Sequence, residues 1–179
     1  MFIRVKRNKL IAISVLMLAG INPGADEVRP GPNLGEPADS RAVSSHDWGI
    51  MPDGAGLPDG SGTAGEGKPI YDRLCVSCHG PGGLGDSADQ LAGAQMQLTD
   101  EWPEKTIGTF WPYAPTLFDF IRRSKPMMEP GSLTNSEVYA LTAYLLYLNG
   151  IIPEDKEMNA AILADVEMPN RDGFIQVLE

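Results

Sequence analysis

The chain has 179 residues, about one domain's worth, with 14 basic against 24 acidic residues for a formal net charge of −10. Such an acidic chain repels phosphate backbones, which disfavours nucleic-acid binding. With only two cysteines and two histidines, the composition excludes a disulfide framework and leaves too few ligands for a tetrahedral zinc cage of Cys and His.

Residues 1–24 have the pattern of a secretory signal peptide. Residues 1–9 carry four basic residues and no acidic one, and an apolar run of 12 residues follows over 10–21. That run is too short to cross a bilayer core, which needs about 20 residues. We expect cleavage between residues 19 and 25 and export to the periplasm; an uncleaved anchor and a buried N-terminal helix are the alternatives. Loss of 1–24 leaves 10 basic and 24 acidic residues, a net charge of −14, so we expect a partner with a basic face.

Residues 25–62 are predicted to form a flexible or strap-like arm ahead of the domain. The stretch 23–69 contains ten glycines and seven prolines, a density that interrupts both helices and strands. A disordered linker is one interpretation of this composition. Because apolar residues recur between Trp48 and Leu57, we favour a flexible start and then, from about Trp48, a strap that lies across the domain surface.

Residues 63–152 are predicted to form a small all-α domain of three or four helices, because helical signals recur there without strand alternation. Residues 66–78 can form a short helix, with Pro69 tolerated only in its first turn. The glycine-rich residues 80–85 require a loop. A C-terminal extension over 153–179 has few helix signals, and we expect it to wrap the domain or to grip a partner.

Two further helices have clearer signals. Four apolar residues of 114–124 have a spacing that suits one helical face: Leu117, Phe118, Phe120 and Ile121. Thr134, as N-cap, and Glu137, three residues later, make a capping box ahead of the apolar run VYALTAYLLYL. The pair 149–150, Asn-Gly, suits the left-handed conformation that ends a helix.

The pentapeptide CVSCH at 75–79 is the strongest signal in the sequence, because C-x-x-C-H is the spacing of covalent c-type haem attachment. Cys75 and Cys78 share one face of a helical turn, so each thiol can add to a different vinyl group of one porphyrin. His79 can then reach the iron as the proximal ligand. We therefore predict one covalently attached haem c.

Three other interpretations of the cysteines are weaker. A thioredoxin-like site needs a βαβ setting, whereas the flanks here are a helix and a glycine loop. A zinc ion would have the three ligands of the motif and only His46, far away in the arm, as the fourth. A disulfide between Cys75 and Cys78 would close a strained, short loop.

A haem iron that carries electrons needs a second ligand. The usual choice is a methionine sulfur on the loop before the last helix, because this soft donor favours ferrous iron. Met127 and Met128 stand there, seven and six residues before Thr134, and either is a candidate for the distal ligand. His46 could instead give a bis-histidine iron; otherwise it is a solvated arm residue. Met96 is interpreted as packing.

Aromatic and basic residues near the motif have two interpretations each. Trp102 and Trp111 either line the haem pocket or serve ordinary packing. The basic cluster of Arg122, Arg123 and Lys125 is either a propionate partner or docking patch, or a solvated helix end favoured by the helix dipole.

Five segments carry a resemblance to a known family: LPDGSGT at 57–63, CVSCHG at 75–80, KTIGTFWPYAPTLFDFIRRS at 105–124, SLTNSEVYALTAYLLYLNGI at 132–151 and MPNRDGF at 168–174. On these segments the chain looks like a class I cytochrome c. More narrowly, residues from about Trp48 to Phe174 resemble the cytochrome subunit of bacterial sulfite/sulfur dehydrogenases, the SoxD-type proteins. CVSCHG alone specifies only the cytochrome superfamily. The longer segments carry the resemblance to the SoxD-type proteins.

The resemblance implies a function. A molybdenum-cofactor subunit, similar to sulfite oxidase, would oxidise a sulfur compound by two electrons. This chain would accept them one at a time and pass each to a downstream periplasmic cytochrome. No nucleophile–base pair is evident in the sequence, so we expect a non-catalytic electron-transfer subunit. The alternatives are a freestanding carrier for another oxidoreductase and a haem enzyme, such as a peroxidase or thiosulfate-oxidising cytochrome, which the paired methionines argue against.

The sequence departs from the SoxD-type pattern at two points. SoxD-type subunits are often longer and carry two haem motifs, while this chain has one. They also tend to have a methionine directly before the proline that matches Pro126, and here that residue is Lys125. The axial methionine is therefore expected at Met127 or Met128, with Lys125 ranked behind them.

Overall fold

The computed structural model describes residues 37–46, 48–175 and 177, so the predicted signal peptide and the first part of the arm lie outside the described residues. The chain divides into two compact units, 1–39 and 40–179, and every described helix and strand belongs to the second. No helix within the described ranges is long and apolar enough to cross a membrane.

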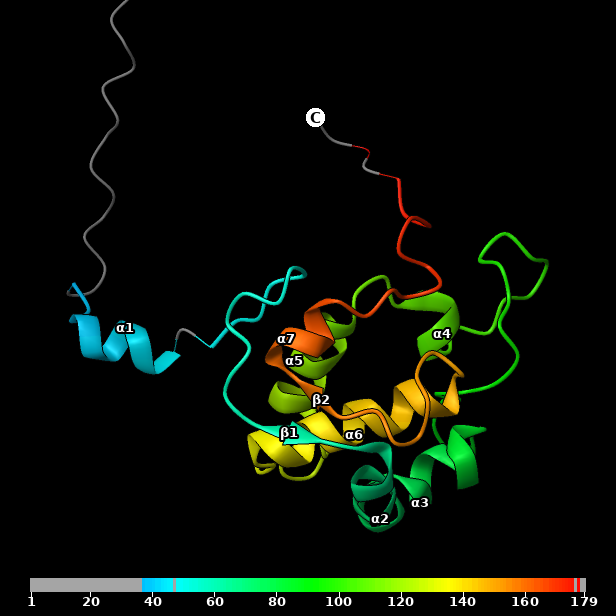
Figure 1. Cartoon of the computed structure of the whole chain (residues 1–179), viewed down its shortest axis with the longest axis horizontal. Coiled ribbons are helices and arrows are strands. Elements are labelled where there is room, and N and C mark those ends of the chain that lie inside the picture. The colour runs from blue at the N-terminus through cyan, green and yellow to red at the C-terminus, as the bar shows by residue number, and fades with distance from the viewer. Residues whose placement is uncertain (1–36, 47, 176, 178–179) are drawn as a thin grey trace, which may run out of the picture. The chain divides into compact units, whose positions relative to one another are not determined.

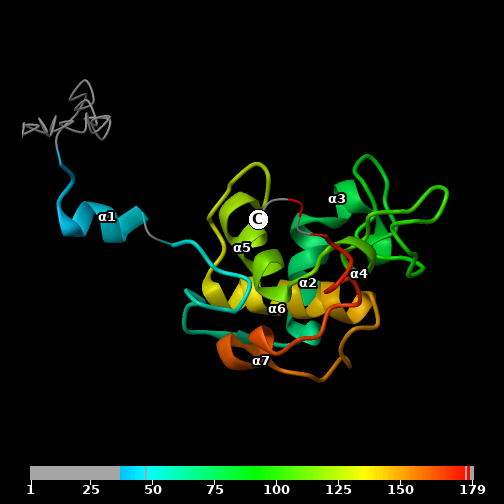
Figure 2. The ribbon, with the colours of Figure 1, turned by 90° about the horizontal axis from the view of Figure 1, so that it is seen from above.

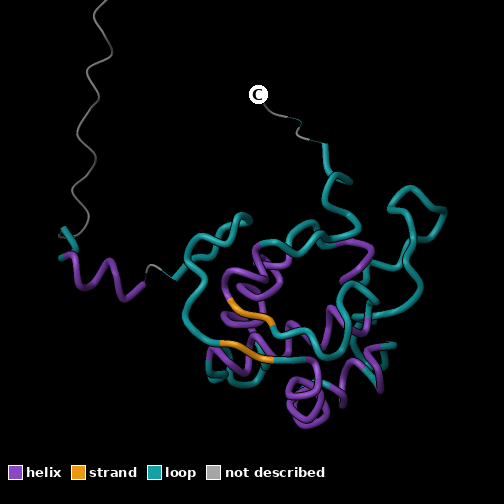
Figure 3. The backbone as a smooth tube through the Cα atoms, viewed as in Figure 1, coloured by secondary structure: helices purple, strands orange, loops and turns teal. Residues whose placement is uncertain are grey.

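The described part is mostly helical, which confirms the predicted all-α fold (Figures 1 and 3). The helices are α1 (Ser40–His46), α2 (Ala64–Leu74), α3 (Val76–His79), the 3₁₀ helix η1 (Pro81–Gly83), α4 (Ile107–Phe110), α5 (Ala114–Ser124), α6 (Asn135–Leu148) and α7 (Ala160–Ala164). The sequence did not reveal the two-residue strands β1 (Ser61–Gly62) and β2 (Met158–Asn159), which pair antiparallel. Two residues are too few to display an alternating pattern.

Helix α2 begins earlier than predicted. Thr63 is its N-cap, and the Glu66 side chain accepts the Thr63 backbone N–H at 2.8 Å, while the Thr63 hydroxyl accepts from the Glu66 N–H. This capping box fixes the start at Ala64 and leaves Pro69 inside the helix, so the expectation that Pro69 would stand in the first turn was wrong. The helix is interrupted at Cys75, and α3 begins at the next residue.

Helix α6 forms the centre of the domain, and its predicted capping box is confirmed. The Thr134 hydroxyl accepts from the Glu137 N–H at 3.3 Å, and the Glu137 carboxylate accepts from the Thr134 N–H at 2.9 Å. Residues 138–146 are buried all round the helix, as expected for a helix in the core. Figure 1 shows α2 and α5 on opposite sides of α6, and Figure 2 shows α2 crossing it.

The strap, residues 48–62, lies against the helical core. Ile50 is buried, and its N–H donates to the buried carboxylate of Asp119 in α5 at 3.3 Å. The Tyr139 hydroxyl of α6 donates to the Pro58 carbonyl at 2.8 Å. These bonds tie the strap to two helices far from it in sequence.

The C-terminal extension wraps the domain over residues 158–170. Met158 and Leu163 are fully buried. The Asn170 side-chain amide donates to the Phe110 carbonyl of α4 at 2.7 Å, which ties the end of the extension to α4.

Candidate functional site

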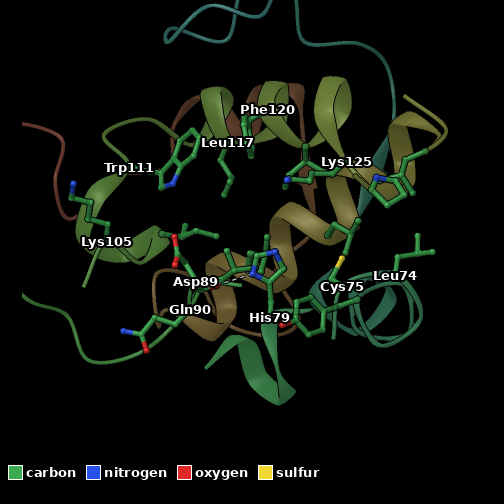
Figure 4. A pocket seen from close by; sticks show the side chains of 18 residues that line it. Leu74, Cys75, His79, Asp89, Gln90, Lys105, Trp111, Leu117, Phe120 and Lys125 are labelled. Atoms are coloured by element: carbon green, nitrogen blue, oxygen red, sulfur yellow. Dashed lines mark hydrogen bonds between the residues drawn. The ribbon is translucent and has the colours of Figure 1, made fainter. Parts of the chain in front are cut away.

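A cavity of about 280 Å³ opens beside the CVSCH segment (Figure 4). Its walls come from α2, α4, α5 and α6 and are mostly apolar. They include Leu74, Ile107, Trp111, Leu117, Phe120 and Leu141. Phe120, which we expected on the buried face of α5, is half-exposed at this cavity because it lies nearly opposite Phe118 on the helix. An apolar cavity with a few polar groups is the usual form of a cofactor site.

His79 enters the cavity from the end of α3, and its ring is held in one orientation. The Nδ1 atom lies 2.8 Å from the backbone carbonyl oxygen of Asp89. A carbonyl oxygen only accepts, so Nδ1 carries the hydrogen and donates it. The other ring nitrogen, Nε2, therefore keeps its lone pair and can bind a metal.

The two cysteines are free thiols on the same short segment. Cys75 is partly buried and lines the cavity, whereas Cys78 is exposed. Burial raises the pKa of the Cys75 thiol, and the nearby Lys125 ammonium acts in the opposite direction. Neither the disulfide nor the thioredoxin-like interpretation finds support, because the cysteines are unpaired and their flanks are helical. In the described part of the chain, no three His, Cys, Asp or Glu side chains gather as a metal site.

The loop after His79 is fixed by Tyr71, whose hydroxyl donates to the Gly80 carbonyl at 2.8 Å. Gly80 has φ of +73°, and a Cβ there would lie 2.4 Å from the Gly85 carbonyl oxygen. Both the left-handed conformation and this close approach require glycine. The loop thereby returns toward α3 and brings the Asp89 carbonyl to His79.

Asn149 links three segments around the cavity, a role that sequence reasoning missed. Its Oδ1 accepts from the Gly108 N–H at 3.0 Å, and its Nδ2 donates to the carbonyls of Leu91 at 3.1 Å and Leu145 at 2.8 Å. The sequence identified Asn149 only as the end of a helix. Its partners in the loop and in α4 are distant along the chain, so no local pattern could have indicated them.

The structure does not bring Met127 and Met128 to the cavity. The Pro126 carbonyl accepts from the Glu129 N–H at 3.0 Å, which makes a turn with the two methionines at its central positions. Their side chains are 72% and 85% exposed, and neither lines the cavity. Lys125, just before the turn, and Pro126, its first residue, line the cavity instead.

Of the other residues that the sequence suggested for the haem site, the structure places some at the cavity and others away from it. Trp111 lines the cavity, whereas Trp102 is 81% exposed and does not. The Met96 sulfur accepts a backbone hydrogen bond at 3.4 Å, consistent with a packing role. His46 lies in α1, where its Nδ1 donates to a backbone carbonyl at 2.9 Å.

The predicted basic cluster does not form one patch. Arg123 pairs with the buried carboxylate of Asp119 within α5. The Arg122 guanidinium lies over the strap's indole ring, 5.9 Å from its centre. Only Lys125 of the cluster enters the cavity, together with Lys105, which the sequence had not singled out.

These residues fit a covalently held haem. One free thiol stands at the junction of α2 and α3 and the other within α3, one imidazole nitrogen is available toward an apolar cavity, and the carbonyl of Asp89 orients that imidazole. These are the groups that attach a c-type haem and bind its iron on the proximal side.

Comparisons with known proteins give the family. A family model for cytochrome c matches residues 64–149, from the start of α2 to the end of α6. The chain belongs to the cytochrome c family, whose members hold haem c covalently and transfer electrons.

A solved structure shows a more specific similarity within this family. The chain is similar to a chain in the crystal structure of the sulfane dehydrogenase SoxCD from Paracoccus pantotrophus, with 39% sequence identity and a TM-score of 0.74. The match covers 80% of this chain and 71% of that one. It confirms the resemblance noted from the sequence. A search among curated proteins finds no significant match.

Proposed function

We propose that this chain is the electron-accepting subunit of an exported sulfur-compound dehydrogenase and that it carries one haem c. The similarity to the sulfane dehydrogenase SoxCD supports the substrate class. The single C-x-x-C-H motif supports one haem per chain. The observation that carries the electron-transfer role is the His79 imidazole, which Asp89 orients so that Nε2 is available beside an apolar cavity.

The residues of the site have distinct roles. Cys75 and Cys78 hold the haem through thioether bonds, and His79 supplies the proximal iron ligand. When bound, the haem takes up and releases one electron at a time. The carbonyl of Asp89 keeps His79 in the tautomer that can bind iron. The apolar walls limit water at the site, which is one of the properties that tune a haem's potential.

The partners follow from the resemblance and from charge. A molybdenum-cofactor subunit similar to sulfite oxidase delivers the electrons, and a downstream periplasmic cytochrome takes them. The net charge of −10 favours docking on a basic face, more so once the signal peptide has been removed. The pattern of residues 1–24 supports export to the periplasm, where bacteria attach haem to C-x-x-C-H motifs.

The test is purification of the full chain from the periplasm of its native cells, with haem and molybdenum measured in the same fractions. We expect one haem per chain, co-elution with molybdenum, and reduction of the haem when sulfite or a sulfane-sulfur compound is added. A monohaem chain that elutes without molybdenum and stays oxidised would contradict the sulfur role and favour a freestanding carrier. A Cys75→Ser/Cys78→Ser variant is the control, because it keeps His79 but cannot attach haem.

A further inference from the structure

Lys125 occupies the part of the cavity that the two predicted methionines do not reach. It is the first residue after α5, and its side chain lines the cavity. Figure 4 shows Lys125 and His79 directed into the same cavity from opposite sides. We propose that the amine of Lys125 is the distal ligand of the haem iron. This inference rests on the haem site proposed above.

The surroundings of Lys125 leave its amine available. Within the described ranges, no carboxylate pairs with it and it makes no side-chain hydrogen bond; the described ion pairs involve Lys68, Arg73 and Arg123. Its Nζ lies 5.2 Å from the centre of the Phe120 ring, at the apolar wall. This ring contact is compatible with an ammonium and does not occupy a nitrogen lone pair, so the amine remains free to bind a metal once its proton is lost.

The alternative ligands are placed less well. Met127 and Met128 are the two central residues of a turn, their side chains are exposed, and their sulfurs would reach the cavity only if that turn were rebuilt. The Met96 sulfur already accepts a backbone hydrogen bond. Lys105 also lines the cavity, but its Nζ lies over the Phe110 ring at 5.9 Å, and Figure 4 shows it at the edge away from Lys125.

Coordination by Lys125 changes the proton count but not the electron count. The ammonium loses one proton to solvent, and the freed nitrogen lone pair makes the bond to iron; no electron is transferred. An amine nitrogen is a harder donor than a thioether sulfur and favours ferric iron. The chain should therefore have a lower reduction potential than the same fold with a methionine at this position.

Three variants of the full, haem-loaded chain test the assignment. Lys125→Met supplies a sulfur from the same position. Lys125→Arg keeps the positive charge and the contact with Phe120, but an arginine does not give up its proton to bind a metal. A Met127→Leu/Met128→Leu double variant removes both sulfurs from the loop. Retention of haem on a denaturing gel, together with circular dichroism, shows first that each variant is folded and that haem is attached.

The optical spectrum of the oxidised protein and its reduction potential are then compared. We expect low-spin ferric haem without a sulfur–iron charge-transfer band in the wild type, and no change in the double methionine variant. Lys125→Met should gain the band and raise the potential, and Lys125→Arg should become high-spin. A wild-type sulfur band that the double methionine variant loses, a high-spin wild type, or a Lys125→Arg variant with a wild-type spectrum would each overturn the assignment. Absence of attached haem in the wild type would instead refute the proposed haem site.

Discussion

Gly67 of α2 lies directly against the backbone of Ala140 in α6, so closely that a Cβ on Gly67 would stand 2.0 Å from the Ala140 carbonyl oxygen. No side chain fits at this distance, and the atoms in the way belong to a helix backbone that cannot move aside. The crossing therefore fixes how close α2 comes to the core. Because Cys75 follows α2 directly, it also fixes the height of the haem-binding segment above α6.

Replacing Gly67 with alanine should force the two helices apart. We expect Gly67→Ala to lower the free energy of unfolding by about 3 kcal/mol or more, at the upper end for overpacked cores. Denaturant unfolding of the haem-loaded chain measures this. Gly65→Ala is the matched control in the same helix, because the nearest atom to its Cβ would be 4.0 Å away. The control should be neutral or stabilising by up to about 1 kcal/mol. Equal effects of the two substitutions would contradict the close crossing.

Asn149 should be worth more to stability than a helix-ending residue usually is. Asn149→Ala leaves the buried Gly108 N–H without its partner and removes one of the two hydrogen bonds that the Leu91 carbonyl accepts, the other coming from the Ile107 N–H. We expect a loss of about 2 kcal/mol or more in unfolding free energy, since each unsatisfied buried group costs about 1–3 kcal/mol. Asn135→Ala removes one exposed hydrogen bond and should cost less than about 1 kcal/mol. If both variants lose the same amount, Asn149 is not the link described.

The hydroxyl of Tyr71 should contribute to stability in a pH-dependent way. Burial raises the pKa of Tyr71 from its ordinary 10.0 to about 12. Because the pKa is higher in the folded chain, this hydroxyl stabilises the fold fully below pH 10 and loses its contribution as the pH rises through 12. Tyr71→Phe should lower the free energy of unfolding by about 0.5–1.5 kcal/mol at neutral pH. It should also make that free energy fall less steeply as the pH becomes alkaline.

Unfolding measured from neutral to alkaline pH tests this role, with Tyr113→Phe as the control. Among the described residues, the Tyr113 hydroxyl has no hydrogen-bond partner, so its removal should change stability by less than about 0.5 kcal/mol. A Tyr71→Phe curve that superimposes on that of the wild type would show that the bond to Gly80 contributes nothing.

The capping box of α6 predicts a dependence at acid pH. Hydrogen bonds from Thr134 hold the pKa of the Glu137 carboxyl below its ordinary 4.5. A lowered pKa stabilises the fold above pH 4.5, and this contribution is lost as the pH falls through the folded value. Thr134→Ala should cost about 0.5–2 kcal/mol at neutral pH and reduce the acid dependence. Glu129→Gln, on an exposed loop, is the control and should leave both unchanged. If the unfolding free energy of Thr134→Ala falls at acid pH as steeply as that of the wild type, the capping box does not make this contribution.

Local signals in the sequence were sufficient for much of the fold. The capping box of Thr134 and Glu137 and the bounds of 114–124 depend on residues a few positions apart, and both are as predicted. The haem motif at 75–79 is equally local, because the three residues predicted to hold the haem stand within five consecutive positions and their spacing alone predicts their roles.

The structural features that could not be predicted from the sequence depend on contacts between distant segments. The β1–β2 pair and the bonds of Asn149 to Gly108 and Leu91 join residues more than 40 positions apart. The distal side of the cavity is the clearest case. Sequence spacing suggested Met127 and Met128, but a turn of four residues directs both outward and leaves Lys125 inside. Which side of a turn faces a cavity is decided by tertiary packing and cannot be read from spacing.

The most direct test of the electron-accepting role is the spectrum of the haem in the native complex when a sulfur compound is added without any other reductant. We predict that ferrous haem forms on addition of sulfite or a sulfane-sulfur compound, to the extent reached with a chemical reductant. Haem that stays ferric with every sulfur compound, yet is fully reduced by the chemical reductant, would contradict the role.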